Sequence, residues 1–100
     1  MKRLWSAFTE DMDRCYFTGR YDDVERHHIF GGIAYRKKSE AYGYVIPLHA
    51  SIHPNGARCR MADHERTGLD LVMKQMAQKD FEAKHGTREE FMEIFGRNYL

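Results

Sequence analysis

The sequence is short of cysteine and of net charge, and each shortage excludes a class of protein. The only two cysteines, Cys15 and Cys59, form no CxxC pair, so neither a disulfide framework nor a complete cysteine zinc knuckle is predicted. A reducing cellular compartment is therefore expected. The formal net charge is only +1, which excludes the strongly basic chains that bind nucleic acid through overall charge. Any nucleic-acid signal must be local.

Long hydrophobic runs are also lacking. No stretch approaches the roughly 20 apolar residues of a membrane span. The basic N-terminus is followed by Thr9-Glu10-Asp11 instead of the apolar core of a signal peptide. The 100 residues, 42% of them hydrophobic, suffice for one domain with a modest core. We therefore expect one soluble cytoplasmic domain.

Histidine, in contrast, is concentrated in one part of the chain. Four of the six histidines fall within residues 24–53, at positions 27, 28, 49 and 53. Imidazole is the usual proton acceptor near neutral pH and the commonest metal ligand. This window is therefore the first place to look for chemistry.

Two strands are predicted inside the histidine window. The β-branched and aromatic residues of 24–30 favour a strand that ends at Gly31-Gly32, because residues without Cβ permit a sharp change of direction. Residues 31–40 are basic and carry little to bury, so a solvated loop is expected. Residues 42–48 favour another short strand, at an edge because they contain a proline. The interpretation is a hairpin with a long basic loop.

The first part of the chain is predicted to support this hairpin. The apolar residues of 1–14 are spaced as in a short amphipathic helix, so a helix or an arm that packs on the domain is expected there. Residues 15–20 favour a strand that enters a turn, with Gly19 able to adopt positive φ.

Helices are predicted after the hairpin. Residues 63–84 place apolar side chains three and four positions apart, and Gly86 is a natural stop. Thr87 and Glu90 form a capping-box sequence, which predicts a last short helix over about residues 88–95. The apolar positions of the longer helix are Leu69, Val72, Met73, Met76 and Phe81.

The segment between the hairpin and the long helix is broken. His49 and His53 have the i, i+4 spacing of one helix face, but Pro54-Asn55-Gly56 follows at once and is a strong turn signal. Any helix here is short or starts afresh after the turn. The fold class predicted is α+β: one ββα-like unit over residues 15–62, with residues 1–14 before it and a helical extension over 63–100.

Clustered histidines suit phosphodiester hydrolysis. That reaction needs a nucleophilic water, a base to deprotonate it, and a cation that neutralises the charge developing on the phosphate. A neutral histidine can be the base near pH 7. Two or three imidazole or carboxylate ligands can hold one divalent ion with open coordination positions.

These residues resemble the HNH, or His-Me finger, endonucleases. Residues 25–32 (ERHHIFGG) are similar to the family's first strand with its histidine pair. Residues 44–53 (YVIPLHASIH) are similar to its second strand, which leads into the metal-binding helix. Residues 36–40, Tyr42-Gly43 and 91–100 look like parts of small phage-encoded HNH-type proteins. The resemblance covers about residues 13–100 and implies a ββα-metal core.

The resemblance assigns a role to three histidines. By position, His28 matches the general base that deprotonates water. His27 matches a metal ligand that is aspartate in many relatives, and His53 matches the final metal-binding histidine. Adjacent side chains of a strand point to opposite faces, so His27 and His28 can serve one site only where the strand ends or bends, as at the glycines beyond.

Other family positions are altered. The family's middle asparagine falls by spacing on Tyr44. The two CxxC pairs of the structural zinc site in many relatives correspond to Cys15, Thr18, His49 and Ile52, of which only two could bind. No complete structural zinc is therefore expected, although Cys15 with His49 could retain a vestige of the site. Otherwise the two cysteines are small semi-buried residues.

The third ligand of the catalytic metal is open. His64 is the first candidate, because the turn at Pro54 could fold it back toward His53; Asp63 and His49 are alternatives. An isolated histidine at a helix start is otherwise a polar surface residue.

The predicted function is metal-dependent hydrolysis of DNA by a phage or prophage HNH-type endonuclease, in the cytoplasm of a bacterial host. One Mg²⁺, Mn²⁺, Zn²⁺ or Ni²⁺ ion is expected, with Arg36, Lys37 and Lys38 as phosphate contacts. Near-neutral charge argues against tight autonomous binding, so a homodimer or a phage protein partner would supply affinity.

Four other interpretations stay open. The basic run could be a solvated loop, and the histidine pair could be structural. The protein could also be a DNA-binding or recombination accessory protein that keeps the HNH fold without its reaction. A purely structural metal-binding module is the fourth.

Overall fold

The two strands of the histidine window pair with each other as predicted. In the computed structural model, which describes residues 3–100, β1 (Val24–His28) and β2 (Val45–His49) form a two-stranded antiparallel sheet. Val24 lies opposite His49, and His28 lies opposite Val45. The α-helices are α1 (Gly32–Tyr42), α2 (Asp63–Lys84) and α3 (Arg88–Phe95). The chain is therefore a small α+β protein.

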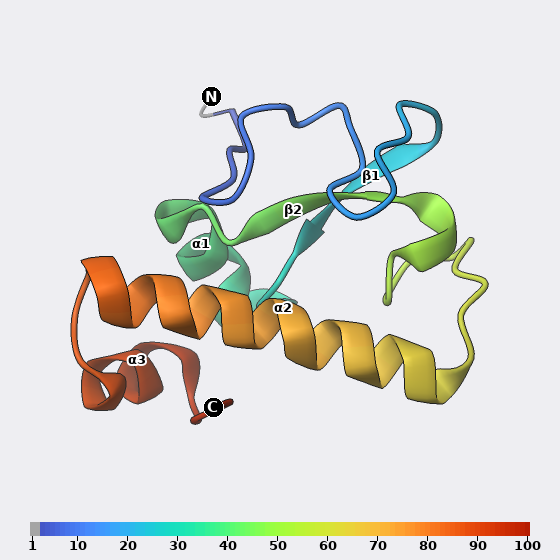
Figure 1. The fold of residues 1–100 in the computed structure, drawn as a ribbon. Coiled ribbons are helices and arrows are strands. Elements are labelled where there is room, and N and C mark those ends of the chain that lie inside the picture. The colour runs from blue at the N-terminus through green and yellow to red at the C-terminus, as the bar shows by residue number, and fades with distance from the viewer. Residues whose placement is uncertain (1–2) are drawn as a thin grey trace.

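The sheet lies between the N-terminal segment and the two C-terminal helices. Figure 1 shows the N-terminal arm on one side of the sheet, α2 running along the other side, and α3 packed against α2. Ile46 and Leu48 belong to the same buried core as Met73 and Ala77 of α2. The core also contains a group of mutually packed aromatic rings: Phe30, Tyr44, Phe81, Phe91 and Phe95.

The basic segment after β1 is a helix, so the prediction of a loop over residues 31–40 was wrong. Gly31 and Gly32 do turn the chain, but α1 begins directly at Gly32. Tyr35, Ser39 and Tyr42 recur at helical spacing, and the two tyrosines pack against the core. Ser39 Oγ donates to the Phe30 carbonyl at 2.9 Å and accepts from the Phe30 amide at 3.1 Å. The charged residues form the solvated side of this helix.

The two C-terminal helices confirm the periodicity and capping predictions. α2 spans the predicted residues, and Met73 and Phe81 are buried, although Val72 is exposed. Thr87 Oγ1 accepts from the Glu90 amide while Glu90 Oε1 accepts from the Thr87 amide, which is the reciprocal capping box. α3 ends at Gly96, whose φ of +96° is the left-handed conformation that glycine adopts without strain.

The N-terminal segment is an arm and not a helix over the described residues 3–14. Residues 1 and 2, also part of that prediction, lie outside the described residues. Ala7 and Phe8 pack against the core. Residues 15–20 form a turn instead of the predicted strand, because Cys15 pairs with Arg20 across it; Gly19 has the predicted positive φ, at +77°.

No metal-binding helix follows β2 directly. A short 3₁₀ turn (Ala50–Ile52) follows instead, and His53 caps its end. The next helix, α2, begins only at Asp63, in keeping with the break predicted at Pro54. Within residues 3–100, no helix combines the length and apolarity needed to cross a membrane.

Candidate functional site

His27 and His53 lie together between β1 and the segment that follows β2. Their ring centroids are 5.0 Å apart and their planes meet at 71°. His27 is 2% exposed. Since side chains two residues apart in a strand share a face, Glu25 lies on the same side of β1 as His27. The fold thus brings two of the predicted metal ligands side by side.

Glu25 holds the His53 ring at its Nδ1 atom. His53 Nδ1 lies 2.7 Å from Glu25 Oε1, and Arg58 Nη2 donates to Glu25 Oε2 at 3.1 Å. The hydrogen bonds from His53 and then Arg58 lower the pKa of Glu25. An ionised carboxylate at Nδ1 leaves the lone pair of His53 on Nε2. A carboxylate on the far nitrogen is the usual support of a metal-binding histidine.

His27 presents an unsatisfied nitrogen. Its Nε2 is buried and has no hydrogen-bond partner among the described residues. Burial, and then electrostatic repulsion from His53, His28 and Lys74, lower the pKa of His27 to about 3. The imidazole is therefore neutral at physiological pH, which is the form that binds metal ions. A buried nitrogen left unpaired costs roughly 1–3 kcal/mol, and a cation held with His53 would satisfy it. The two imidazoles could supply two of the ligands of a divalent ion.

Acid is expected to destabilise the metal-free protein through His27. The unfolded chain takes up a proton near pH 6.5 and the folded chain only near pH 3, so the unfolded state binds more protons between these values. The free energy of unfolding should therefore fall as the pH is lowered through this window, by about 1.4 kcal/mol per pH unit from this residue. Urea denaturation with a chelator at pH 7, 5 and 4 measures the effect.

His27→Leu serves as the control for this pH dependence, since it fills the buried position with an apolar side chain and removes the titrating imidazole. All other ionisable groups are common to both proteins. The variant should show a flatter loss of stability with acid. Parallel profiles for the two proteins would contradict the assignment of a strongly depressed pKa to His27.

His28 lies on the opposite face of β1 from His27. The strand is regular through both residues, with His27 opposite Ile46 and His28 opposite Val45. His28 Nε2 is 2.9 Å from Glu40 Oε2 of α1, and Arg36 Nε is 4.0 Å from the same oxygen. With Nε2–H donated to Glu40, Nδ1 keeps its lone pair, which is how an oriented general base is built. The bend that would bring both histidines to one face is not present.

The other predicted site residues are dispersed. His64 is exposed in the first turn of α2, and it does not join His27 and His53 in any group of three close ligand atoms within residues 3–100. Arg36 and Lys37 are exposed on α1. Lys38 Nζ instead donates to the Ile94 carbonyl at 3.0 Å and lies over the Tyr35 ring, so it fastens α1 to α3.

The altered family positions have structural roles. Tyr44 is buried in the core, and its hydroxyl donates to Asp80 Oδ2 at 3.1 Å. Cys15 is buried as a free thiol. Its burial raises the pKa, but hydrogen bonds from Thr18 and from the His49 backbone outweigh burial and lower the pKa overall. The thiol therefore sits in a turn whose amides point at sulfur.

Two carboxylates of the site were missed in the sequence. Glu25 carried a usable signal, because it lies two residues before His27 on a predicted strand. Glu40 carried none once residues 31–40 were interpreted as a loop, since only a helix brings it back to His28. Comparisons of the chain with protein-family models, with curated proteins and with solved structures give no match.

Proposed function

We propose that the protein is a metal-dependent endonuclease of the HNH type that hydrolyses DNA phosphodiester bonds. The observation that carries this proposal is the buried Nε2 of His27, which has no hydrogen-bond partner within residues 3–100 and lies beside the ring of His53. Buried polar groups normally have partners, so this exception points to a bound species. A ββα-metal interpretation of the fold would take β1, β2 and the turn at His53 as its metal-binding part.

The proposed roles combine the resemblance to HNH endonucleases with the contacts that each residue makes. His27 and His53 would hold one divalent ion, and Glu25, itself held by Arg58, would orient His53. When bound, the ion supplies charge neutralisation for the phosphate. His28 would accept the proton of the attacking water at Nδ1, with Glu40 fixing its tautomer and stabilising the imidazolium that forms. Arg36 and Lys37 would contact DNA phosphates beside it.

A second candidate function is a non-catalytic DNA-binding or recombination accessory protein. The observation that favours it is the regular course of β1, which directs His27 and His28 to opposite faces of the sheet. Hydrolysis needs the base and the phosphate-neutralising cation at one scissile bond. A protein that only binds DNA has no such requirement.

Nicking of supercoiled plasmid at low salt distinguishes the two functions. We expect wild-type protein to nick in the presence of Mg²⁺, Mn²⁺, Ni²⁺ or Zn²⁺ and His28→Ala to lose at least 100-fold in rate, the lower part of the range for a general base. A chelator should abolish cutting. If no metal supports nicking while wild type and variant shift DNA equally in a gel, the endonuclease is excluded and the accessory function replaces it.

A further inference from the structure

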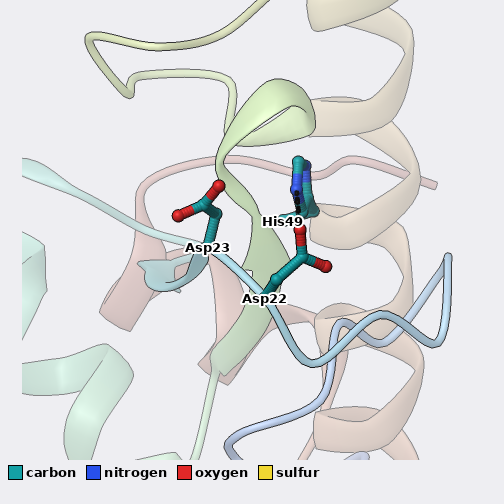
Figure 2. Close-up of side chains that lie close together, drawn as sticks. All are labelled: Asp22, Asp23 and His49. Atoms are coloured by element: carbon teal, nitrogen blue, oxygen red, sulfur yellow. Dashed lines mark ion pairs between the residues drawn. The ribbon is translucent and has the colours of Figure 1, made fainter.

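A second group of metal-type ligands lies at the other face of the sheet. Asp22 and Asp23 directly precede β1, and His49 is the last residue of β2. The pairing of Val24 with His49, and a 2.8 Å hydrogen bond from the Ala50 amide to the Asp23 carbonyl, hold these segments together. One ligand atom from each of the three side chains lies within 4.8 Å of the other two (Figure 2).

His49 supplies an independent indication of a ligand. The residue is 8% exposed, and its Nε2 is buried without a hydrogen-bond partner in the described part of the chain. Figure 2 shows the Asp22 carboxylate directed at this ring, with Asp22 Oδ2 3.7 Å from Nε2. That separation is too long for a hydrogen bond. It is close to the roughly 3.4 Å between two ligands that each lie about 2.1 Å from a tetrahedral ion.

The surroundings of the three ligands also fit a cation. In the structure His49 Nδ1 accepts from the Ser51 amide at 3.2 Å, so the neutral ring carries its proton on Nε2, where a cation would replace it. On metal binding the proton would move to Nδ1, where Ser51 Oγ at 2.7 Å can accept it in place of the hydrogen bond from the Ser51 amide. Arg20 binds both oxygens of Asp22, and Arg58 Nη1 lies 3.4 Å from Asp23 Oδ1. These arginines orient the carboxylates, and a bound cation would have to share the carboxylate oxygens with them.

We propose that Asp22, Asp23 and His49 form a binding site for a transition-metal cation such as Zn²⁺, Mn²⁺ or Co²⁺. One imidazole with two carboxylates suits these ions better than Mg²⁺ or Ca²⁺, which prefer oxygen ligands alone. The bound ion would tie the segment before β1 to the end of β2. Its ligands are distinct from the His27–His53 pair, because residues 46 and 48 share the His27 face while residue 49 points to the other face. The two sites have Arg58 in common, which contacts both Asp23 and Glu25.

Equilibrium dialysis with Zn²⁺ tests the site on the intact protein. The variant Asp22→Asn/Asp23→Asn removes two exposed ligands and leaves the core untouched, and circular dichroism confirms its fold. We expect it to bind one Zn²⁺ fewer than wild type, or to lose at least tenfold in affinity at one site. Asp11→Asn/Asp13→Asn, at two exposed aspartates of the same segment, should bind as wild type does.

The outcomes separate this site from the proposed nuclease centre. If wild type binds two Zn²⁺ ions and Asp22→Asn/Asp23→Asn binds one, both sites are supported. If wild type binds one ion and the variant binds none, only the site at Asp22, Asp23 and His49 is supported. The His49 imidazole NMR signals should shift with Zn²⁺ in wild type and stay unchanged in the variant. Equal stoichiometry and affinity in the two proteins, or a wild type that binds no Zn²⁺, would overturn the proposal.

Discussion

Replacing His53 with alanine is expected to weaken Mn²⁺ binding at the His27–His53 pair by at least about 100-fold and to abolish metal-dependent nicking. Loss of a residue that merely supports a metal ligand already costs about 10–100-fold in affinity, so loss of the ligand itself should reach the upper end or beyond. Calorimetric titration with Mn²⁺ in the Asp22→Asn/Asp23→Asn background isolates this site.

His64→Ala is the matched control for this experiment. His64 is exposed at the start of α2 and forms no group of three close ligand atoms with His27 and His53 within residues 3–100, so its removal should leave both Mn²⁺ affinity and nicking unchanged. The turn at Pro54 made His64 the first candidate for the third ligand, because it could fold the chain back toward His53. A loss in His64→Ala equal to that in His53→Ala would show that the region after Pro54 folds back in the active protein.

Phe81→Ala is expected to lower the free energy of unfolding by about 3–5 kcal/mol. Phe81 is 2% exposed, and its ring centroid lies 5.5 Å from those of Tyr42 and Phe91, so it joins α1, α2 and α3. Truncation leaves a cavity that the surrounding rings cannot fill without leaving their own contacts. Since domains of this size are stable by only about 5–15 kcal/mol, a large part of the stability would be lost.

Urea denaturation measures this change as a lower midpoint at constant slope. Val72→Ala on the same helix is the control, because Val72 is 46% exposed and should change stability by less than about 1 kcal/mol. If Phe81→Ala behaved like Val72→Ala, the aromatic group would not be the core that holds the helices together.

The helices of this protein differ in how far the sequence predicts them. α2 and α3 follow from periodic apolar residues, the Thr87–Glu90 capping box and the glycines at their ends, which are all local signals. The sequence did not predict α1, because Gly31-Gly32 and three consecutive basic residues are typical of a loop. Its helical spacing rests on Tyr35, Ser39 and Tyr42, and the contact that holds it, Ser39 to the Phe30 backbone, is made only in the folded chain.

The residues of the site also differ in how far the sequence predicts them. The window that contains His27 and His53 is evident from the concentration of histidine, and the structure places these two rings together. His28 and His27 lie on opposite faces because adjacent side chains of a regular strand alternate, and Gly31-Gly32 do not bend the strand at the two histidines. Glu40 and the Asp22–Asp23 pair depend on α1 and on strand register, so no local pattern marks them.

Anomalous X-ray scattering from crystals of the protein grown with Mn²⁺ tests the central claim most directly. A cation held by His27 and His53 predicts an anomalous peak within about 2.3 Å of Nε2 of each ring, with Glu25 still bonded to His53 Nδ1. A peak near His49 alone, or no peak in the protein, would contradict a metal centre at His27 and His53 and with it the proposed nuclease.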